Sequence, residues 1–248
     1  MMCIENIPMN TYFRFGWRLF ALLVLATQID PAHANLSVYP MRVAAEPGKH
    51  AEFRVTSQSP STQFVQVVIK QVLDPGTPQE REIDVAGGAR AALLASPAKF
   101  AVPGGGSRLV RLIPLQELSE EGVFRAYVEG VGAEANESSV DVDVGQGTTA
   151  SLKVNLIWGV LVHLLPKGGE MDVRLEGNTL RNAGTLRVGI TGVAECDGRD
   201  CNEHSWNTTL YPGRQLNLPF ERMPGRSVQL SYRLSQDPFQ DKAQTLGP

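Results

Sequence analysis

The sequence has very little of the chemistry that enzymes need. It holds three cysteines and four histidines among 248 residues, and it contains no G-x-S-x-G or H-E-x-x-H motif. No nucleophile–base pair and no closed set of metal ligands can be recognised from residue types and spacing. The sequence therefore gives no support to an enzyme and predicts no cofactor.

Two fragments resemble parts of functional sites, and both have a plainer structural interpretation. The glycine run 104–106 would cradle a phosphate only if a helix followed it. The segment that follows, Leu109–Ile113, is instead apolar and extended. Asp141 and Asp143 alternate on one face of a predicted strand, where such a pair more often increases solubility than performs acid–base catalysis. Both fragments are interpreted as structural.

Strong charge and long hydrophobic runs are also missing. Lysine and arginine number 23 against 26 acidic residues, which gives a net charge of −3. This balance argues against nucleic acid or an anionic membrane as partner. After residue 34, no run approaches the roughly 18 apolar residues that a spanning helix needs. No membrane insertion is predicted.

The first 34 residues have the pattern of a secretory signal peptide. Arg14 and Arg18 precede the short apolar run Leu19–Ala26, and Ala32-His33-Ala34 forms an A-x-A cleavage site. The apolar run is too short to cross a membrane. We therefore expect cleavage after Ala34 and an exported chain that begins at Asn35.

Export decides how the cysteines are interpreted. Cys3 would leave with the signal peptide, and Cys196 and Cys201 would remain. In an oxidising compartment, two cysteines this close together indicate a disulfide that closes a tight loop. The alternative is a metal site formed with His204, but it lacks an evident fourth ligand. The disulfide is the favoured prediction, and no metal is expected.

From Asn35 onward, the hydrophobic pattern has the period of two that β-strands show. Turn signals recur about every ten residues, which is typical of β-sandwiches, and no amphipathic helix is evident. We predict an all-β protein with two sandwich domains, at residues 35–160 and 161–235. A polar and disordered tail is expected at 236–248.

The longest alternation runs through Val140–Trp158. Its even positions are mostly apolar and its odd positions mostly polar, so an extended strand here has one face of each kind. Such a strand is either buried between sheets or exposed at an edge, where it can pair with another chain. The apolar residues most suited to such pairing are Val140, Val142, Val144, Ala150, Leu152 and Val154.

A set of segments along the chain forms a combined pattern: Val38–Val43, Leu94–Phe100, Arg111-Leu112, Phe124–Val128, Gly159–Pro166 and Leu180–Gly184. In their order and spacing, these segments resemble the periplasmic pilus (fimbrial) chaperones. Cys196, Cys201 and the following Tyr211–Arg214 are most similar to the alternate, common-pilus-type branch of that family.

The resemblance implies two immunoglobulin-like sandwiches arranged as an L, located in the periplasm. It also implies a function: members of this family lend a β-strand to an incomplete pilus subunit, a process called donor-strand complementation. The implied partners are pilus subunits and an outer-membrane usher. The apolar residues of the 140–154 stretch would then be the plugs that fill the open groove of the subunit.

By the family pattern, two cations in the cleft between the domains bind the terminal carboxylate of the subunit. Arg42 matches the first cation by its place in the first strand, and an arginine can hold a carboxylate through two parallel hydrogen bonds. Lys153 is the candidate for the second cation. Alignment on the following apolar run points instead to Asn155. The family's arginine after this strand falls near Gly159, so the usual salt bridge between the domains lacks that residue here.

A structural or adhesive pilus subunit, or an exported immunoglobulin-like binding module, is the alternative function. A subunit should carry its own N-terminal arm of alternating apolar residues. Arg42 follows Asn35 closely, which leaves little room for such an arm. The chaperone is therefore the favoured prediction.

Overall fold

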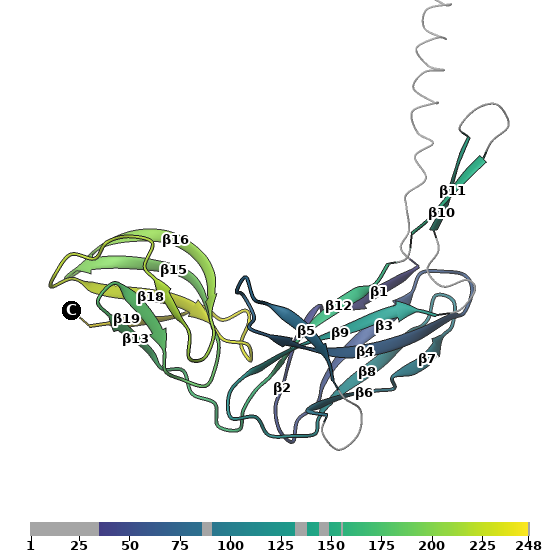
Figure 1. Ribbon diagram of the computed structural model, residues 1–248, viewed down its shortest axis with the longest axis horizontal. Coiled ribbons are helices and arrows are strands. Elements are labelled where there is room, and N and C mark those ends of the chain that lie inside the picture. Colours follow the sequence, from purple (N-terminus) through teal and green to yellow (C-terminus); the bar gives the residue numbers. More distant parts are fainter. Residues whose placement is uncertain (1–34, 86–90, 132–137, 144–148, 155, 248) are drawn as a thin grey trace, which may run out of the picture. The chain divides into compact units, whose positions relative to one another are not determined.

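The structure is a computed structural model. It describes residues 35–85, 91–131, 138–143, 149–154 and 156–247. For the strands at residues 138–143 and 149–154, only the backbone and its pairing are described. The expected signal peptide lies outside the described residues. Every regular element that the structure describes is a β-strand (Figure 1), which confirms the all-β prediction.

The first sandwich consists of two sheets. One has the strand order β1-β3-β8-β6, and the other has the order β2-β12-β9-β4-β5 with β7 also paired to β4. The strands of the first sheet are β1 (Leu36–Tyr39), β3 (Ala51–Ser57), β8 (Ser107–Pro114) and β6 (Leu93–Ser96). Those of the second are β2 (Arg42–Ala45), β12 (Trp158–Leu164), β9 (Gly122–Gly130), β4 (Gln63–Leu73), β5 (Arg81–Asp84) and β7 (Lys99–Val102).

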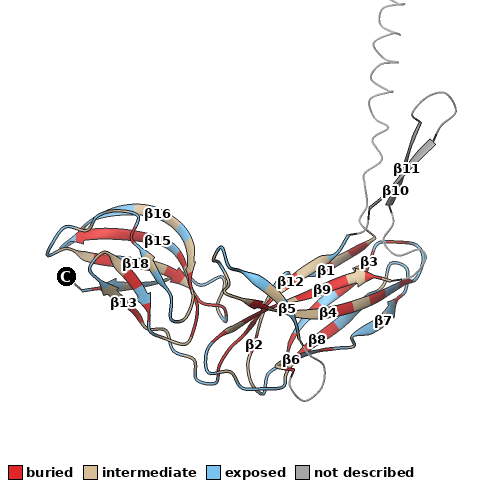
Figure 2. Cartoon of the chain, in the orientation of Figure 1, coloured by how far each residue is buried: buried red, intermediate tan, exposed pale blue. Residues whose placement is uncertain are grey.

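The two sheets enclose one hydrophobic core. Alternate residues of each strand point inward, so buried and exposed positions follow one another along β3 and β8 (Figure 2). Phe53 and Phe124 are the largest fully buried side chains, and Leu112 and Leu164 are buried with them. Burial of each such side chain contributes about 1.5–3 kcal/mol to folding.

The chain changes sheets at Pro40. β1 pairs with β3 in one sheet, whereas β2 pairs in parallel with β12 in the other. Proline has no N–H to donate to a β-ladder, so it is tolerated where a strand leaves its sheet. This crossover places Arg42 at the first position of β2, and it therefore fixes where the pairing between β2 and β12 begins.

The second sandwich has its own sheets and its own core. Its sheets have the strand orders β13-β14-β17 and β16-β15-β18-β19. Leu180, Ile190, Leu210 and Leu230 are fully buried between them. The strands are β13 (Val173–Glu176), β14 (Thr179–Asn182), β17 (Gln215–Asn217), β16 (Asp200–Leu210), β15 (Val188–Asp197), β18 (Ser227–Arg233) and β19 (Lys242–Leu246).

Two of the expected boundaries differ from the structure. β12 pairs with β9 up to Leu164, so the first sandwich continues past residue 160. The polar tail 236–248 contains β19, which pairs with β18 and buries Leu246 in the second core. A single buried leucine among polar residues gives a weak hydrophobic pattern, yet the ladder to β18 holds the strand in place.

The stretch Val140–Trp158 is not one continuous strand. The structure divides it into β10 (Ser138–Asp143), β11 (Thr149–Val154) and the start of β12. β10 and β11 pair with each other as an antiparallel two-stranded sheet. A hairpin satisfies more main-chain groups within the segment than one long edge strand does. The two-residue period is the same in both arrangements, so periodicity alone does not distinguish them.

Asn182 holds the second sandwich together from within the motif Leu180–Gly184. It is completely buried. Its side-chain amide donates to the carbonyls of Leu186 at 2.8 Å and Leu210 at 3.1 Å, and its Oδ1 accepts from the N–H of Gly184 at 2.9 Å. One side chain thus satisfies three main-chain groups, two on the connection between β14 and β15 and one at the end of β16.

We predict that Asn182→Ala lowers the free energy of unfolding by about 2–4 kcal/mol, because it leaves buried main-chain groups without partners. Urea denaturation followed by circular dichroism measures this loss. Asn217→Ala is the matched control, since Asn217 is exposed and only accepts from Thr179 Oγ1. Equal effects of the two substitutions would contradict the structural role of Asn182.

Candidate functional site

The candidate site is built on β12, because the two sides of this strand are paired over different lengths. On the β9 side, the register runs from Trp158 to Leu164. On the β2 side, the described register begins only at Leu161, which is opposite Arg42. The start of β12 thus extends beyond the first residue of β2, and among the described residues no strand pairs with it on this side.

Main-chain geometry shows which groups face this side. The N–H of Leu161 donates to the carbonyl of Met41 at 2.9 Å, so Leu161 turns its main-chain groups toward β2. Main-chain direction alternates along a strand, and residues two positions apart therefore present N–H and C=O groups on the same side. Gly159 and Ile157 consequently present theirs on the side where β2 has ended.

Arg42 stands at the end of this free stretch. Its side chain is exposed, and it makes no hydrogen bond or ion pair with the residues that the structure describes. Cross-strand partners share one face of a sheet, so Arg42 lies on the same face as its partner Leu161. That face is the outer one, because the inward positions of β12 are Val160 and Val162.

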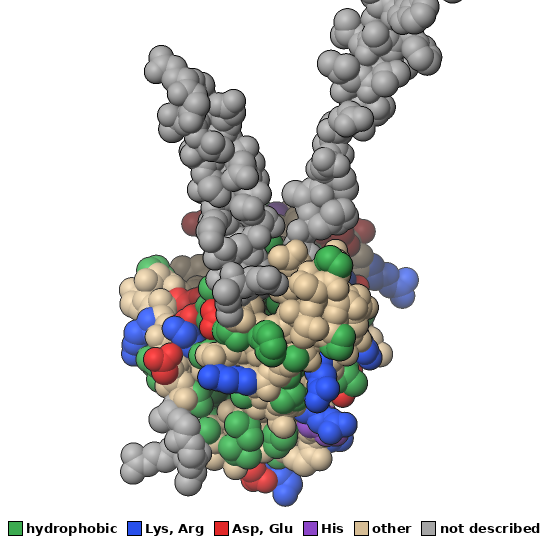
Figure 3. All heavy atoms as spheres, turned by 90° about the vertical axis from the view of Figure 1, so that its right-hand side faces the viewer, with side chains coloured by type: hydrophobic (Ala, Val, Ile, Leu, Met, Phe, Trp, Pro, Cys, Tyr) green, Lys and Arg blue, Asp and Glu red, His purple; other side chains and the backbone are tan. Residues whose placement is uncertain are grey.

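Apolar side chains are exposed on both sides of the free stretch. Leu156 and Ile157 come just before β12, and they are 43% and 52% exposed. Tyr39 and Met41 lie at the crossover between β1 and β2, and Tyr39 is 78% exposed. Hydrophobic side chains are also interspersed with Lys and Arg on the face of the molecule in Figure 3. Exposed apolar residues beside unpaired main chain are typical of a binding edge.

The β10–β11 hairpin carries most of the predicted plugs. The register pairs Val140 with Leu152 and Val142 with Ala150, so apolar residues are opposite apolar residues. Val154 is opposite Ser138 at the open end of the hairpin. Val144 lies outside the described residues.

The register does not bring Lys153 to Arg42. Lys153 pairs with Ser139 in the hairpin, whereas the residue of this stretch that is opposite Arg42 is Leu161. Asn155, the other candidate for the second cation, lies outside the described residues. Of the predicted anchor residues that the structure describes, Arg42 is the one located beside the free part of β12.

A buried polar cluster, which sequence reasoning missed, lies close to Arg42. The carboxylate of Glu121 accepts from the main-chain N–H of Arg187 at 2.9 Å and from the hydroxyl of Ser235 at 2.5 Å. Arg187 Nε donates to the same hydroxyl at 2.6 Å and lies 3.5 Å from Glu121 Oε1. His163, on β12, has its Nδ1 2.8 Å from that oxygen. All four side chains are buried.

Burial controls the ionisation of this cluster. Loss of hydration lowers the pKa of His163 below its usual range. The Glu121 carboxylate opposes this shift, while the positive charges of Arg187 and Arg42 add to it. The distance between His163 and Glu121 is short, but the angles fall outside hydrogen-bond geometry, and neither ring nitrogen has a hydrogen-bond partner among the described residues. We therefore treat His163 as neutral near pH 7.

Arg187 is the cation that pairs with Glu121. Loss of hydration lowers the pKa of Arg187, and Glu121 opposes this shift. Arginine nevertheless stays charged in proteins, so this pair holds one positive and one negative charge. The pairing joins a residue just before β9 to one just before β15. The Glu121–Arg187 pair forms without an arginine near Gly159, the position that the family pattern suggested.

The disulfide prediction is confirmed. Cys196 and Cys201 are bonded and are direct partners in the β15–β16 register. His204, which the alternative metal site would need, stacks its ring on Phe220 with 4.4 Å between the ring centroids. Both sulfurs are used in the covalent bond, so they are not thiolate ligands for a metal.

Similarity in sequence to known proteins extends over most of the chain. One relative, a CS1 fimbrial protein of Escherichia coli that is named as a subunit, is 32% identical over 210 residues, which cover 81% of this chain and 86% of that protein. No protein-family model matches the chain. Within the described residues, the structure has no helix long and apolar enough to cross a membrane.

Two solved structures share the fold. The class 5 fimbriae chaperone CfaA is 23% identical with a TM-score of 0.67, covering 86% of this chain and all of that one. A chain of a chaperone–tip adhesin complex from CFA/I fimbriae biogenesis is 22% identical with a TM-score of 0.65, covering 87% of this chain and all of that one. Although the CS1 relative is named as a subunit, the shared fold is that of chaperones.

The fold and the free stretch of β12 define a binding protein of two immunoglobulin-like sandwiches with a sheet edge open to a further strand. With the sequence relationship, they identify its family. The chain belongs to the periplasmic pilus (fimbrial) chaperones. The predicted fold class and family are confirmed.

The lowered pKa of His163 predicts a pH-dependent stability. An unfolded histidine has a pKa of about 6.5, so below this pH the unfolded chain binds a proton that the folded chain resists. Neutral His163 therefore makes its full contribution to the free energy of unfolding above pH 6.5, and this contribution is lost as the pH falls toward the pKa of His163 in the folded chain. For one titrating group, the free energy of unfolding changes by at most about 1.4 kcal/mol per pH unit.

His163→Gln should reduce this slope, as measured by urea denaturation at several pH values between 5 and 8. His50→Gln is the control, because His50 is exposed on the loop before β3. A slope that is the same in His163→Gln as in the unmodified chain would show that His163 is not the titrating group.

Proposed function

We propose that this chaperone captures incomplete pilus subunits in the periplasm by lending them the β11–β12 edge, and that it delivers them to an outer-membrane usher. The observation that carries the proposal is the free stretch of β12 beside the exposed Arg42. A pilus subunit that lacks a strand exposes its core, and an added strand covers it. The role needs no cofactor and no nucleic acid.

The geometry of β2 supports one direction for the subunit strand. β2 is parallel to β12 and starts at Arg42. A subunit strand that also runs parallel to β12 would lie in line with β2 and end where β2 begins. Its terminal carboxylate would then meet the Arg42 guanidinium, which is suited to bind it through two charge-assisted hydrogen bonds.

The hairpin would supply the side chains that fill the subunit groove. β11 leads directly toward β12, so Ala150, Leu152 and Val154 continue the strand that pairs with the subunit. Val140, Val142 and Val144 would extend the apolar face from the neighbouring strand. In strand addition, main-chain hydrogen bonds provide affinity and alternate side chains provide specificity.

Arg42→Ala should abolish subunit capture and leave the fold intact, because one exposed charge contributes little to stability. Co-purification of the chaperone with a co-expressed fimbrial subunit measures capture, and circular dichroism measures the fold. Arg54→Ala is the matched control: Arg54 is an exposed arginine of β3, in the other sheet, and it donates to Ser107. Normal capture by Arg42→Ala would exclude the anchor role.

Leu152→Asp should reduce capture at least tenfold, because it would place a charge in the apolar groove of the subunit. Ser151→Asp, at the neighbouring position of opposite parity, should have little effect. The same co-purification assay compares the two variants. Equal loss in both variants, or in neither, would contradict the assignment of the even positions as plugs.

Co-expression also tests the proposal as a whole. Candidate subunits are produced with and without the chaperone, and the soluble heterodimer is quantified. A chain that protects no fimbrial subunit from aggregation, while its own fold is intact, would refute the chaperone function and favour a structural or adhesive role.

A further inference from the structure

A row of charged residues crosses the outer face of the six-stranded sheet. The registers link Arg42 on β2, Leu161 on β12, Arg125 on β9, Lys70 on β4 and Asp84 on β5. Residues linked in this way share one face. Arg42 and Arg125 are therefore on the same face with a single strand between them, which places their backbones about 10 Å apart. Arginine side chains are long enough for both to reach one group above Leu161.

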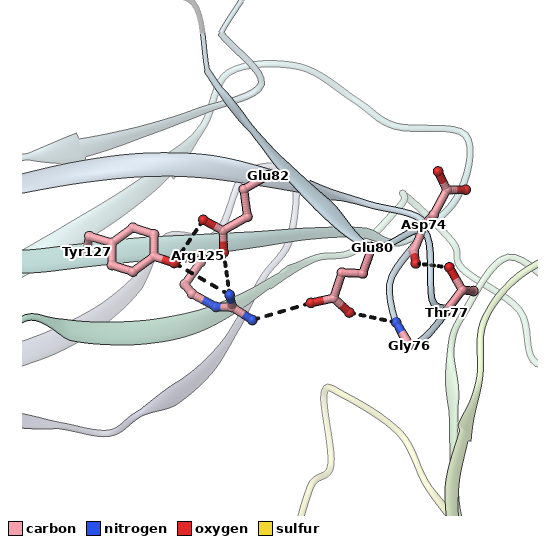
Figure 4. Close-up of polar contacts among 7 residues, drawn as sticks. All are labelled: Asp74, Gly76, Thr77, Glu80, Glu82, Arg125 and Tyr127. Atoms are coloured by element: carbon pink, nitrogen blue, oxygen red, sulfur yellow. Dashed lines mark hydrogen bonds and ion pairs between the residues drawn. The ribbon is translucent and has the colours of Figure 1, made fainter.

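Arg125 already binds a carboxylate. Its Nη1 donates to Glu82 Oε1, and its Nη2 lies 3.8 Å from Glu80 Oε1. The hydroxyl of Tyr127 is 2.8 Å from both carboxylate oxygens of Glu82. Figure 4 shows Arg125 between Tyr127, Glu82 and Glu80. A guanidinium and a hydroxyl thus converge on a single carboxylate, which β5 supplies at the edge of the sheet.

Gly159 brings Arg125 close to the free stretch of β12. A Cβ atom at this position would lie 3.1 Å from Cδ of Arg125 and 3.5 Å from Cε1 of Tyr127. The aliphatic part of Arg125 consequently lies against the backbone of β12 where that strand extends beyond β2. A larger residue at position 159 would push the arginine and the tyrosine away from this backbone.

The two arginines differ in how their charges are compensated. Arg42 has no charged partner among the described residues, whereas Arg125 is paired and its side chain is 33% exposed. The Arg125–Glu82 pair is partly solvated, so an exchange of one carboxylate for another costs little. Lys153, the other cation considered for this role, registers with Ser139 in the hairpin.

We propose that Arg125 is the second cation that binds the terminal carboxylate of the added strand, together with Arg42. In the free chaperone, Glu82 occupies the Arg125 guanidinium and is displaced when the carboxylate arrives. This inference rests on the proposed function, since it requires a strand that ends beside Arg42. It assigns to Glu82 the role of an internal competitor.

A synthetic peptide of about twelve residues tests the proposal, a length sufficient to pair along β11 and the start of β12. It alternates valine and threonine after an N-terminal fluorescein and two lysines, and contains no acidic side chain. One version ends in a free carboxylate and the other in an amide. Fluorescence anisotropy with the exported chain gives the Kd of each version, and their ratio measures recognition of the carboxylate.

We expect the unmodified protein to prefer the free carboxylate by about a hundredfold, as two charge-assisted contacts allow. Arg125→Gln should reduce this ratio by about tenfold. Glu82→Gln should change affinity in the opposite direction, with about three- to tenfold tighter binding of the free carboxylate and unchanged binding of the amide. Misfolding cannot explain a gain of affinity, so Glu82→Gln protects the test against a purely structural effect. Lys153→Gln and Lys70→Gln should leave the ratio unchanged.

The outcomes separate the inference from the function on which it rests. An unchanged ratio in Arg125→Gln, or loss of the ratio in Lys153→Gln, would overturn the assignment of Arg125 and leave the chaperone function intact. Failure of the unmodified protein to bind either peptide would count against strand addition itself, and the inference would fall with it.

Discussion

The functional features of this protein depend on the unequal pairing of β12. Seven residues of β12 pair with β9, but the pairing with β2 starts at Leu161. Because of this difference, main-chain donors and acceptors at the start of β12 have no partner strand among the described residues on the β2 side. The rest of β12 is paired on both sides. Such a strand is held rigidly by its β9 neighbour, so an arriving strand pairs with a preformed edge and bears less of the entropy cost of ordering it.

The buried cluster near this edge contains an arginine that is paired and buried, which distinguishes it from the exposed Arg42. Arg187 is compensated by Glu121 and is inaccessible, while Arg42 nearby is exposed and has no described partner. Removal of Glu121 would leave a buried cation uncompensated, which is far more destabilising than the pair is stabilising. Because Glu121 already pairs with Arg187 and accepts a hydrogen bond from Ser235, it does not neutralise Arg42. The charge on Arg42 therefore remains available to a ligand.

The elements that were predictable from the sequence are those with a local signal. The two-residue period indicated the strands, and the spacing of Cys196 and Cys201 indicated their bond. The hairpin was not predictable from periodicity, because folding Val140–Trp158 back on itself preserves the alternation. Glycines at positions 145 and 147 were the available turn signal.

The residues that sequence reasoning missed depend on contacts between distant segments. Glu121, His163 and Arg187 carry no mutual spacing that could reveal their cluster. Arg125 was visible only as a polar residue in an alternating strand, and its relation to Arg42 emerges from the order β2-β12-β9. Strand order is set by the packing of the whole sandwich, and a single sequence does not record it.

The short length of β2 has a consequence for fidelity. Under the proposed function, a strand that adds in line with β2 would end at Arg42, so its position would be set by its own last residue and not by its length. A slip of one residue would turn every apolar side chain to the opposite face. The C-terminal residue of the added strand would therefore set its register. Strands of different lengths would pair in the same register, whereas one extra residue at the C-terminus would shift the register of the whole strand.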